Sequence, residues 1–155
     1  MGSKNARAEM NVSAIRHGTV IDHVESDATF KVAEILRVQE GENMVLVGIN
    51  LESKHLGKKG IIKIEERELT ADEVNKIALI APLATLNIIS DFKVVEKSRV
   101  QLPDMIERVV KCFNPRCVTN HQGVTTRFDV IESHPPALRC RYCERVMRGK
   151  DILLK

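Results

Sequence analysis

The chain has 155 residues and a formal net charge of +3, and 43% of its residues are hydrophobic. This length allows one medium domain or two small ones, and the apolar fraction suffices for a globular core. The sequence has no apolar run long enough for a membrane span, and its polar start, MGSKNARAEM, lacks the apolar centre of a secretory signal. We therefore expect a cytoplasmic protein with no membrane partner, in which residues 1–11 form a mobile tail.

The first hundred residues alternate between strand-like and helix-like segments. Residues 26–36 have apolar positions at helical spacing, behind two possible N-caps, Ser26 and Asp27. Three stretches around this helix predict strands because they are rich in β-branched or other apolar residues: 18–24, 44–50 and 61–65.

The segment LTADEVNKIALIAP, residues 69–82, carries the clearest helix signals. Thr70 followed by Glu73 predicts a capping box, and Pro82 prevents the helix from continuing. Two short strands are predicted after it: 84–89 and 91–96. The order β-α-β-β-α-β with one further strand predicts an α+β fold, a ferredoxin-like α/β sandwich in which two helices cover one face of an antiparallel sheet.

A domain boundary is predicted near residues 97–104, which contain few large apolar residues and a proline. Residues 12–100 are assigned to the first domain and residues 101–155 to the second. In the second domain, residues 124–131 alternate between apolar and polar and predict a half-buried strand, and ALRC and ILL near the end predict two more. We therefore expect a small all-β domain.

All four cysteines lie in this second domain, in a C-x4-C pair and a C-x2-C pair: Cys112, Cys117, Cys140 and Cys143. Disulfides are rare in the reducing cytoplasm, whereas paired cysteines on tight turns supply the four thiolates of a tetrahedral structural Zn²⁺ site. A small domain with few aromatic residues also needs such a cross-link. The spacing predicts one structural Zn²⁺ per chain in a zinc-ribbon-like domain, with His121 and His134 at the surface. Unrelated buried cysteines and a redox pair are the alternatives.

The basic excess belongs to the cysteine-bearing part. From Asp104 onward there are 10 Lys/Arg against 6 Asp/Glu, compared with 14 against 15 before it. A solvated face is the commoner explanation, and the other is a zinc-ribbon factor that binds nucleic acid. Four Phe, one Tyr and no Trp leave little for base stacking, so we expect no nucleic-acid partner.

The sequence contains no recognisable catalytic constellation, such as G-x-x-x-x-G-K-[ST], G-x-S-x-G or H-E-x-x-H. Asp22 and His23 are adjacent in a predicted strand, so their side chains are expected on opposite faces, where they cannot form a dyad. Lys63 interrupts an apolar strand, and its ammonium is expected to be solvated, paired or facing a charged ligand. The same alternatives hold for Lys97.

Four segments, together with the cysteine pattern, resemble one family: GTVIDH (18–23), IIKIE (61–65), LTADEVNKIALIAPLATLN (69–87) and VVEKSR (94–99). From about Val12 to the C-terminus, the chain is similar to the regulatory chain of aspartate carbamoyltransferase. The resemblance implies a non-catalytic allosteric subunit of pyrimidine biosynthesis. Its first domain would bind CTP or ATP and pair with a second regulatory chain, and its zinc domain would contact the catalytic chain.

The resemblance also implies site residues. Nucleotide contacts would come from Ser13, Ala14, Ile15, Asp22, His23, Lys63, Asn87, Phe92, Val94 and Lys97. Contacts to the catalytic chain would come from Asn114, Arg116, Arg141 and Tyr142. Phe92 stands where better-known members have tyrosine, and Arg116 where they often have asparagine. The lysines would supply positive charge to a triphosphate, and the signal is expected to pass through residues 97–104.

Overall fold

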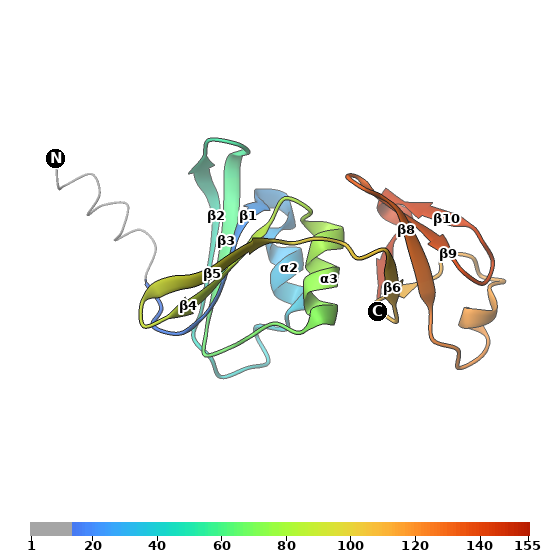
Figure 1. The fold of residues 1–155 in the computed structure, drawn as a ribbon, viewed down its shortest axis with the longest axis horizontal. Coiled ribbons are helices and arrows are strands. Elements are labelled where there is room, and N and C mark those ends of the chain that lie inside the picture. Colours follow the sequence, from blue (N-terminus) through green and yellow to red (C-terminus); the bar gives the residue numbers. More distant parts are fainter. Residues whose placement is uncertain (1–13) are drawn as a thin grey trace. The chain divides into compact units, whose positions relative to one another are not determined.

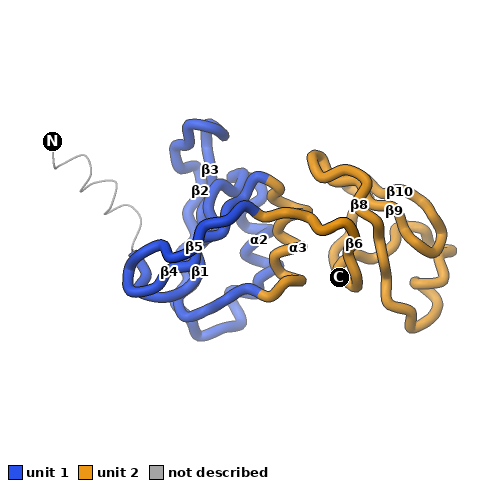
Figure 2. The backbone as a smooth tube through the Cα atoms, in the orientation of Figure 1, with its two compact units in different colours: residues 1–69, 83–99 blue, residues 70–82, 100–155 orange. Residues whose placement is uncertain are grey.

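The computed structural model describes residues 14–155 in two compact units (Figures 1 and 2). The first unit runs to Leu69 and also contains Leu83–Arg99, whereas the second contains Thr70–Pro82 and Val100–Lys155. The chain therefore passes between the units three times. Helix α3 (Ala71–Ile80) belongs to the second unit, although in sequence it lies between two strands of the first.

The first unit is built on a five-stranded antiparallel sheet in the order β2-β3-β1-β4-β5. Its strands are β1 (Gly18–Glu25), β2 (Val45–Ser53), β3 (Gly57–Glu65), β4 (Thr85–Ser90) and β5 (Lys93–Arg99). The order β2-β3-β1-β4 is that of a ferredoxin-like sandwich, and β5 adds one strand at its edge. The predicted α+β class and the predicted strands are confirmed.

Helix α2 (Thr29–Ile35) follows a short 3-10 turn, η1 (Ser26–Ala28), and lies against β2 and β3. The prediction that Ser26 or Asp27 caps this helix is wrong. The N-cap residues are Glu25 for the turn and Ala28 for the helix, and neither side chain makes a capping hydrogen bond. The Ser26 hydroxyl instead accepts a hydrogen bond from the Asn50 backbone N–H at 3.1 Å. It therefore ties the start of the helix to β2.

Gly60 of β3 allows the start of α2 to lie close to the sheet. A Cβ at this position would lie 1.8 Å from Oγ1 and 2.8 Å from Cβ of Thr29, which is itself fully buried. We expect Gly60→Ala to lower the free energy of unfolding by about 2 kcal/mol or more, as overpacking of a core does. Chemical denaturation measures the loss. Gly41→Ala is the matched control, since its nearest neighbouring atom is 3.6 Å away, and equal losses in both variants would contradict this account.

Strands β1 and β2 each gain one residue where they pair with β3. The two irregular stretches contain His23 and Asn50, with φ values of 56° and 58°. A bulge of this kind interrupts the alternation of side chains along a strand. The Nδ1 atom of His23 consequently lies 3.9 Å from Oδ2 of Asp22. The prediction that these two side chains project to opposite faces is therefore wrong.

The second unit is an all-β module joined by α3. One sheet has the order β10-β9-β8-β6, and a second pairs β11 with β7. The strands are β6 (Met105–Glu107), β7 (Val110–Lys111), β8 (Arg127–Ser133), β9 (Pro136–Cys140), β10 (Val146–Arg148) and β11 (Leu153–Leu154). The predicted strands in this region are confirmed, and β6, β7 and β10 are additions.

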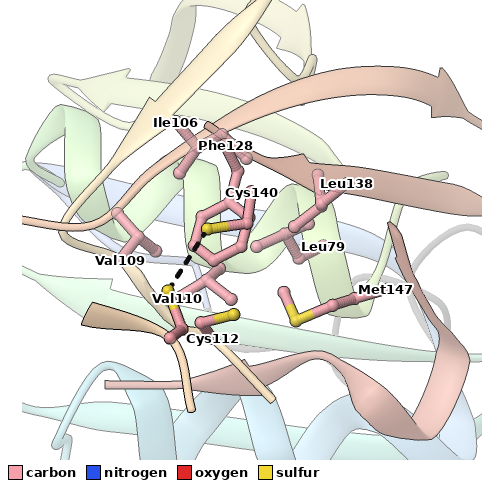
Figure 3. Packing of buried hydrophobic residues seen from close by; sticks show 10 residues of the cluster. Leu79, Ile106, Val109, Val110, Cys112, Phe128, Leu138, Cys140 and Met147 are labelled. Carbon is pink, nitrogen blue, oxygen red and sulfur yellow. Dashed lines mark hydrogen bonds between the residues drawn. The ribbon is translucent and has the colours of Figure 1, made fainter. Parts of the chain in front are cut away.

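The core of the second unit surrounds Phe128, Leu138 and Met147, each with no exposed surface (Figure 3). Leu79 of α3 packs in the same cluster. The helix begins with the predicted capping box: the Glu73 N–H donates to Thr70 Oγ1 at 3.2 Å, and the Thr70 N–H donates to Glu73 Oε1 at 3.0 Å. Across residues 14–155, no helix is both long and apolar enough to cross a membrane.

Candidate metal centre and open sheet face

Two tight turns of the second unit present the four cysteines. In the first turn, Cys112–Cys117, the Cys117 N–H donates to the Asn114 carbonyl at 3.0 Å, and the Arg116 N–H donates to Asn114 Oδ1 at 3.1 Å. In the second, which begins at the end of β9, the Glu144 N–H donates to the Cys140 carbonyl at 2.9 Å. Each turn directs its two cysteine side chains to the same point.

The four sulfur atoms lie within 4.8 Å of one another. The Sγ–Sγ distances are 3.7 Å for Cys112–Cys143 and 3.7 Å for Cys117–Cys140. Four thiolates placed 2.3 Å from a tetrahedrally bound metal are separated by about 3.8 Å, so these spacings fit such an ion. Three of the cysteines are buried and Cys143 is half-buried. The four cysteines are thus placed to hold a metal ion.

Burial and hydrogen bonds act in opposite directions on these thiols. Burial raises the pKa of Cys112 and Cys140, and backbone N–H groups directed at their sulfur atoms oppose that rise only in part. Burial also acts to raise the pKa of Cys143, but the Arg145 N–H, the Asn114 side chain and neighbouring thiols outweigh it and lower the pKa to about 7. Donors that point at sulfur stabilise the thiolate, which is the metal-binding form.

A tetrahedral four-thiolate site has no open coordination position, so a metal held here would support the fold and would not activate water. His121 and His134 are exposed, as predicted, and among the described residues the cluster of ligand atoms contains only the four cysteines. The His121 ring instead contacts the Pro115 carbonyl, with 2.6 Å between Nε2 and the oxygen.

In the first unit, several predicted nucleotide-binding residues line up across the sheet. Lys63 of β3 lies opposite Val20 of β1, Val20 lies opposite Asn87 of β4, and Asn87 lies opposite Lys97 of β5. Residues directly paired across antiparallel strands project to the same face. We call this face, which carries Lys63, Val20, Asn87 and Lys97, the open face. Buried residues such as Ile62 occupy the opposite face.

Asp22 and His23 lie on neighbouring parts of the open face. Asp22 Oδ1 lies 2.9 Å from Nζ of Lys59 and accepts a hydrogen bond from the His23 N–H at 2.6 Å. His23 Nδ1 lies 3.0 Å from Oγ1 of Thr85 on β4. The bulge at His23 therefore places an acid, an imidazole and a lysine in one polar cluster.

The charges on this face perturb one another. Burial alone would raise the pKa of Asp22, but the hydrogen bond and charge of Lys59, together with the His23 N–H, lower it below its ordinary value. Burial lowers the pKa of Lys63, and the negative charge of Asp22 partly opposes this effect. Asp22 is therefore an anion whose charge is balanced by nearby lysines.

Lys59 was not predicted as a site residue. It lies two and four residues before Ile61 and Lys63 on the regular strand β3, and so projects to the same face. The signal in the sequence was the spacing of Lys59 and Lys63 in GKKGIIKIE: two residues four positions apart project to the same face if the segment is a strand.

An apolar cluster borders the polar part of the open face. It comprises Ile15, Val20 and Ile61, with Leu51 and Ile89 packed against them. Val94 is 56% exposed and lies opposite Ile89. Phe92 is 62% exposed, and its N–H donates to the Arg16 carbonyl at 3.0 Å. Ala14 is exposed, and Ser13 lies outside the described residues.

The four residues predicted to contact a partner surround the metal site but differ in accessibility. Asn114 is buried, and Arg116 is exposed. Arg141 is paired with Asp129 at 2.8 Å, and the Tyr142 hydroxyl donates to the Thr125 carbonyl at 3.1 Å. Arg116, Arg141 and Tyr142 are therefore exposed to a partner, whereas Asn114 is not.

Comparison with known proteins matches both parts of the chain to one family. Residues 10–101 match the allosteric domain, and residues 104–153 the metal binding domain, of the aspartate carbamoyltransferase regulatory chain. A regulatory chain of that name from Pyrococcus abyssi is 53% identical over 148 residues, covering 94% of this chain and 97% of that protein. Those from Thermococcus sibiricus (54% over 145 residues; 94% and 96%) and Phocaeicola vulgatus (43% over 152 residues; 98% and 97%) match similarly. The chain belongs to the family of aspartate carbamoyltransferase regulatory chains, and is a non-catalytic subunit.

Proposed function

We propose that the chain binds the nucleoside triphosphates CTP and ATP on the open face and passes this signal to the catalytic chain of aspartate carbamoyltransferase in pyrimidine biosynthesis. The row formed by Lys63, Asn87 and Lys97 beside an apolar cluster carries the proposal. Such a surface offers cations for a triphosphate, an amide for polar contacts and an apolar wall for a base.

The residues of the open face divide into two groups by chemistry. Lys63 and Lys97 would contact phosphate oxygens as point charges. The ion pair between Lys59 and Asp22 reduces the repulsion that an unpaired carboxylate would exert on a triphosphate. At the apolar side of the open face, backbone groups around residues 13–15 would contact the base, with Val94 and Phe92 as exposed apolar neighbours.

The metal is proposed to be Zn²⁺, one per chain. A tetrahedral set of four sulfur donors selects Zn²⁺ or an iron–sulfur cluster, and the spacing of the four sulfur atoms fits a single ion. Zn²⁺ would supply no reaction step here. The four cysteine side chains would hold it, and the backbone N–H groups of the two turns would stabilise their negative charge.

We assign effector binding and pairing with a second regulatory chain to residues 12–100, and the contact with the catalytic chain to residues 101–155 through Asn114, Arg116, Arg141 and Tyr142. The predicted tail, residues 1–11, lies outside the described residues. A nucleotide can shift activity only if it binds two states of the assembly with different affinity. Residues 97–104 are the proposed route for that signal, in a cytoplasmic complex.

Nucleic-acid binding, the alternative function, has less support because much of the basic charge is paired. In the second unit, Arg108 lies 3.0 Å from Asp72, Arg141 lies 2.8 Å from Asp129, and Arg148 lies 2.9 Å from Glu132. Pairing of this kind reduces the positive charge available to phosphates.

Calorimetric titration of the full chain tests the proposed function. We expect saturable binding of CTP and of ATP, weakened by added salt because lysine–phosphate contacts are screened. Co-purification with the catalytic chain, before and after metal removal, tests assembly and should succeed only with metal bound. Absence of saturable binding to both nucleotides would disprove the effector site, and assembly of the metal-free chain would disprove the role of the metal.

A further inference from the structure

The residues that follow the first cysteine turn bind back onto it. They lie in the short 3-10 helix η2 (Val118–Asn120) and at His121, and their side chains contact sulfur or carbonyl oxygens of the turn. None of them is a cysteine, and the function proposed above gives them no role. Two of these residues, Thr119 and Asn120, act at the cysteines themselves.

Thr119 places a hydroxyl group against a cysteine sulfur inside the core. Its Oγ1 lies 3.1 Å from Sγ of Cys117, and the two residues are 8% and 2% exposed. A cysteine that binds metal is a thiolate and carries no hydrogen, so the hydroxyl must be the donor. A hydrogen bond to a charged acceptor is stronger than one between neutral groups. The contact therefore favours the charged, metal-binding form of Cys117.

Asn120 connects two carbonyl groups of the same turn. Its Nδ2 donates to the Cys112 carbonyl at 3.0 Å and to the Asn114 carbonyl at 2.8 Å. Both partners are acceptors only, so the amide nitrogen must face them, and each of its two hydrogens has one acceptor. These bonds hold the backbone at Cys112 in the conformation of the turn. Less conformational entropy is then lost when a metal binds.

We propose that Thr119 and Asn120 are positioning residues of the metal centre: Thr119 stabilises the Cys117 thiolate, and Asn120 fixes the backbone that carries Cys112. The inference rests on the proposed Zn²⁺ site, because it assigns the residues that support the ligands of that site. Outer residues of this kind typically contribute about 10–100-fold to metal affinity.

Zn²⁺ competition with a chromophoric chelator tests the proposal on the full chain. We expect Thr119→Val and Asn120→Ala to bind Zn²⁺ about tenfold or more weakly than wild type and to release it faster. Thr119→Ser keeps the hydroxyl and should remain near wild type. Gln122→Ala, at an exposed position two residues beyond Asn120, is the matched control and should leave affinity unchanged.

The Co²⁺-substituted protein provides a second readout. In Thr119→Val, the sulfur-to-metal absorption band should move to longer wavelength, since one thiolate has lost its donor. Wild-type affinity and an unshifted band in Thr119→Val would overturn the role of Thr119, and wild-type release from Asn120→Ala would overturn that of Asn120. Valine matches threonine in shape, so Thr119→Val still tests the role of Thr119 even if Asn120→Ala does not fold. A wild-type chain that takes up no Zn²⁺ would instead refute the metal site.

Discussion

Replacement of Cys117 by serine is expected to abolish metal binding and to unfold the cysteine-bearing module. Cys117 is 2% exposed and belongs to the apolar cluster of Phe128, Leu138 and Met147. Structural Zn²⁺ contributes roughly 10–16 kcal/mol to the folding of small domains, comparable to or larger than the whole stability of most of them. Hydrogen exchange followed by mass spectrometry should show lost protection in peptides from residues 105–155.

The five-stranded sheet supplies the internal control for this experiment. Its buried residues, including Ile21, Val24 and Ile62, belong to the other compact unit, so peptides from β1 and β3 should keep their protection. Chelation of the wild-type chain should reproduce the effect, and added Zn²⁺ should reverse it. Full protection of residues 105–155 in the Cys117→Ser chain would show that the metal is dispensable for this fold.

Replacement of Lys63 by alanine is expected to weaken CTP and ATP binding by about 10–100-fold. Lys63 is half-buried at one end of the row across the open face, and a hydrogen bond to a charged group contributes about 1.5–3 kcal/mol. Calorimetric titration measures the loss for each nucleotide.

Lys58→Ala is the matched control for that variant. Lys58 lies on the same strand and is exposed, and it projects to the face opposite Lys63 because the two residues are five positions apart on β3. The two variants remove the same charge, so any general electrostatic effect is common to both. If nucleotide affinity is unchanged in Lys63→Ala, or falls equally in Lys58→Ala, the open face is not the nucleotide site.

Local signals in the sequence predicted much of the fold and the metal centre. The capping box of Thr70 and Glu73 depends on four neighbouring residues, so its geometry is set by the segment itself. The two cysteine pairs likewise lie on short turns, and the spacing of each pair limits where its sulfur atoms can project. The residues of the row through Lys63 were instead implied by the resemblance to regulatory chains, and their alignment across the sheet depends on pairing between strands that are distant in sequence.

Features that depend on contacts between distant segments were not predictable. The bulge at His23 arises where β1 pairs with β3, and no residue type in GTVIDH predicts it. Asn120 donates to carbonyl oxygens of a turn six to eight residues earlier. Every residue has a backbone carbonyl, so the residue types of the turn do not predict this contact. The grouping of α3 with the second unit depends on Leu79, whose partners lie in strands formed much later in the chain.

The threefold passage of the chain between the two units restricts how such a gene can recombine. A chimera joined at residue 100 would inherit Leu79 from one parent and its partners Phe128 and Leu138 from the other. Only an exchange that also transfers the codons for residues 70–82 keeps these partners together. A single crossover at this point would therefore separate Leu79 from its partners, whereas an exchange of both segments of the second unit would keep them together.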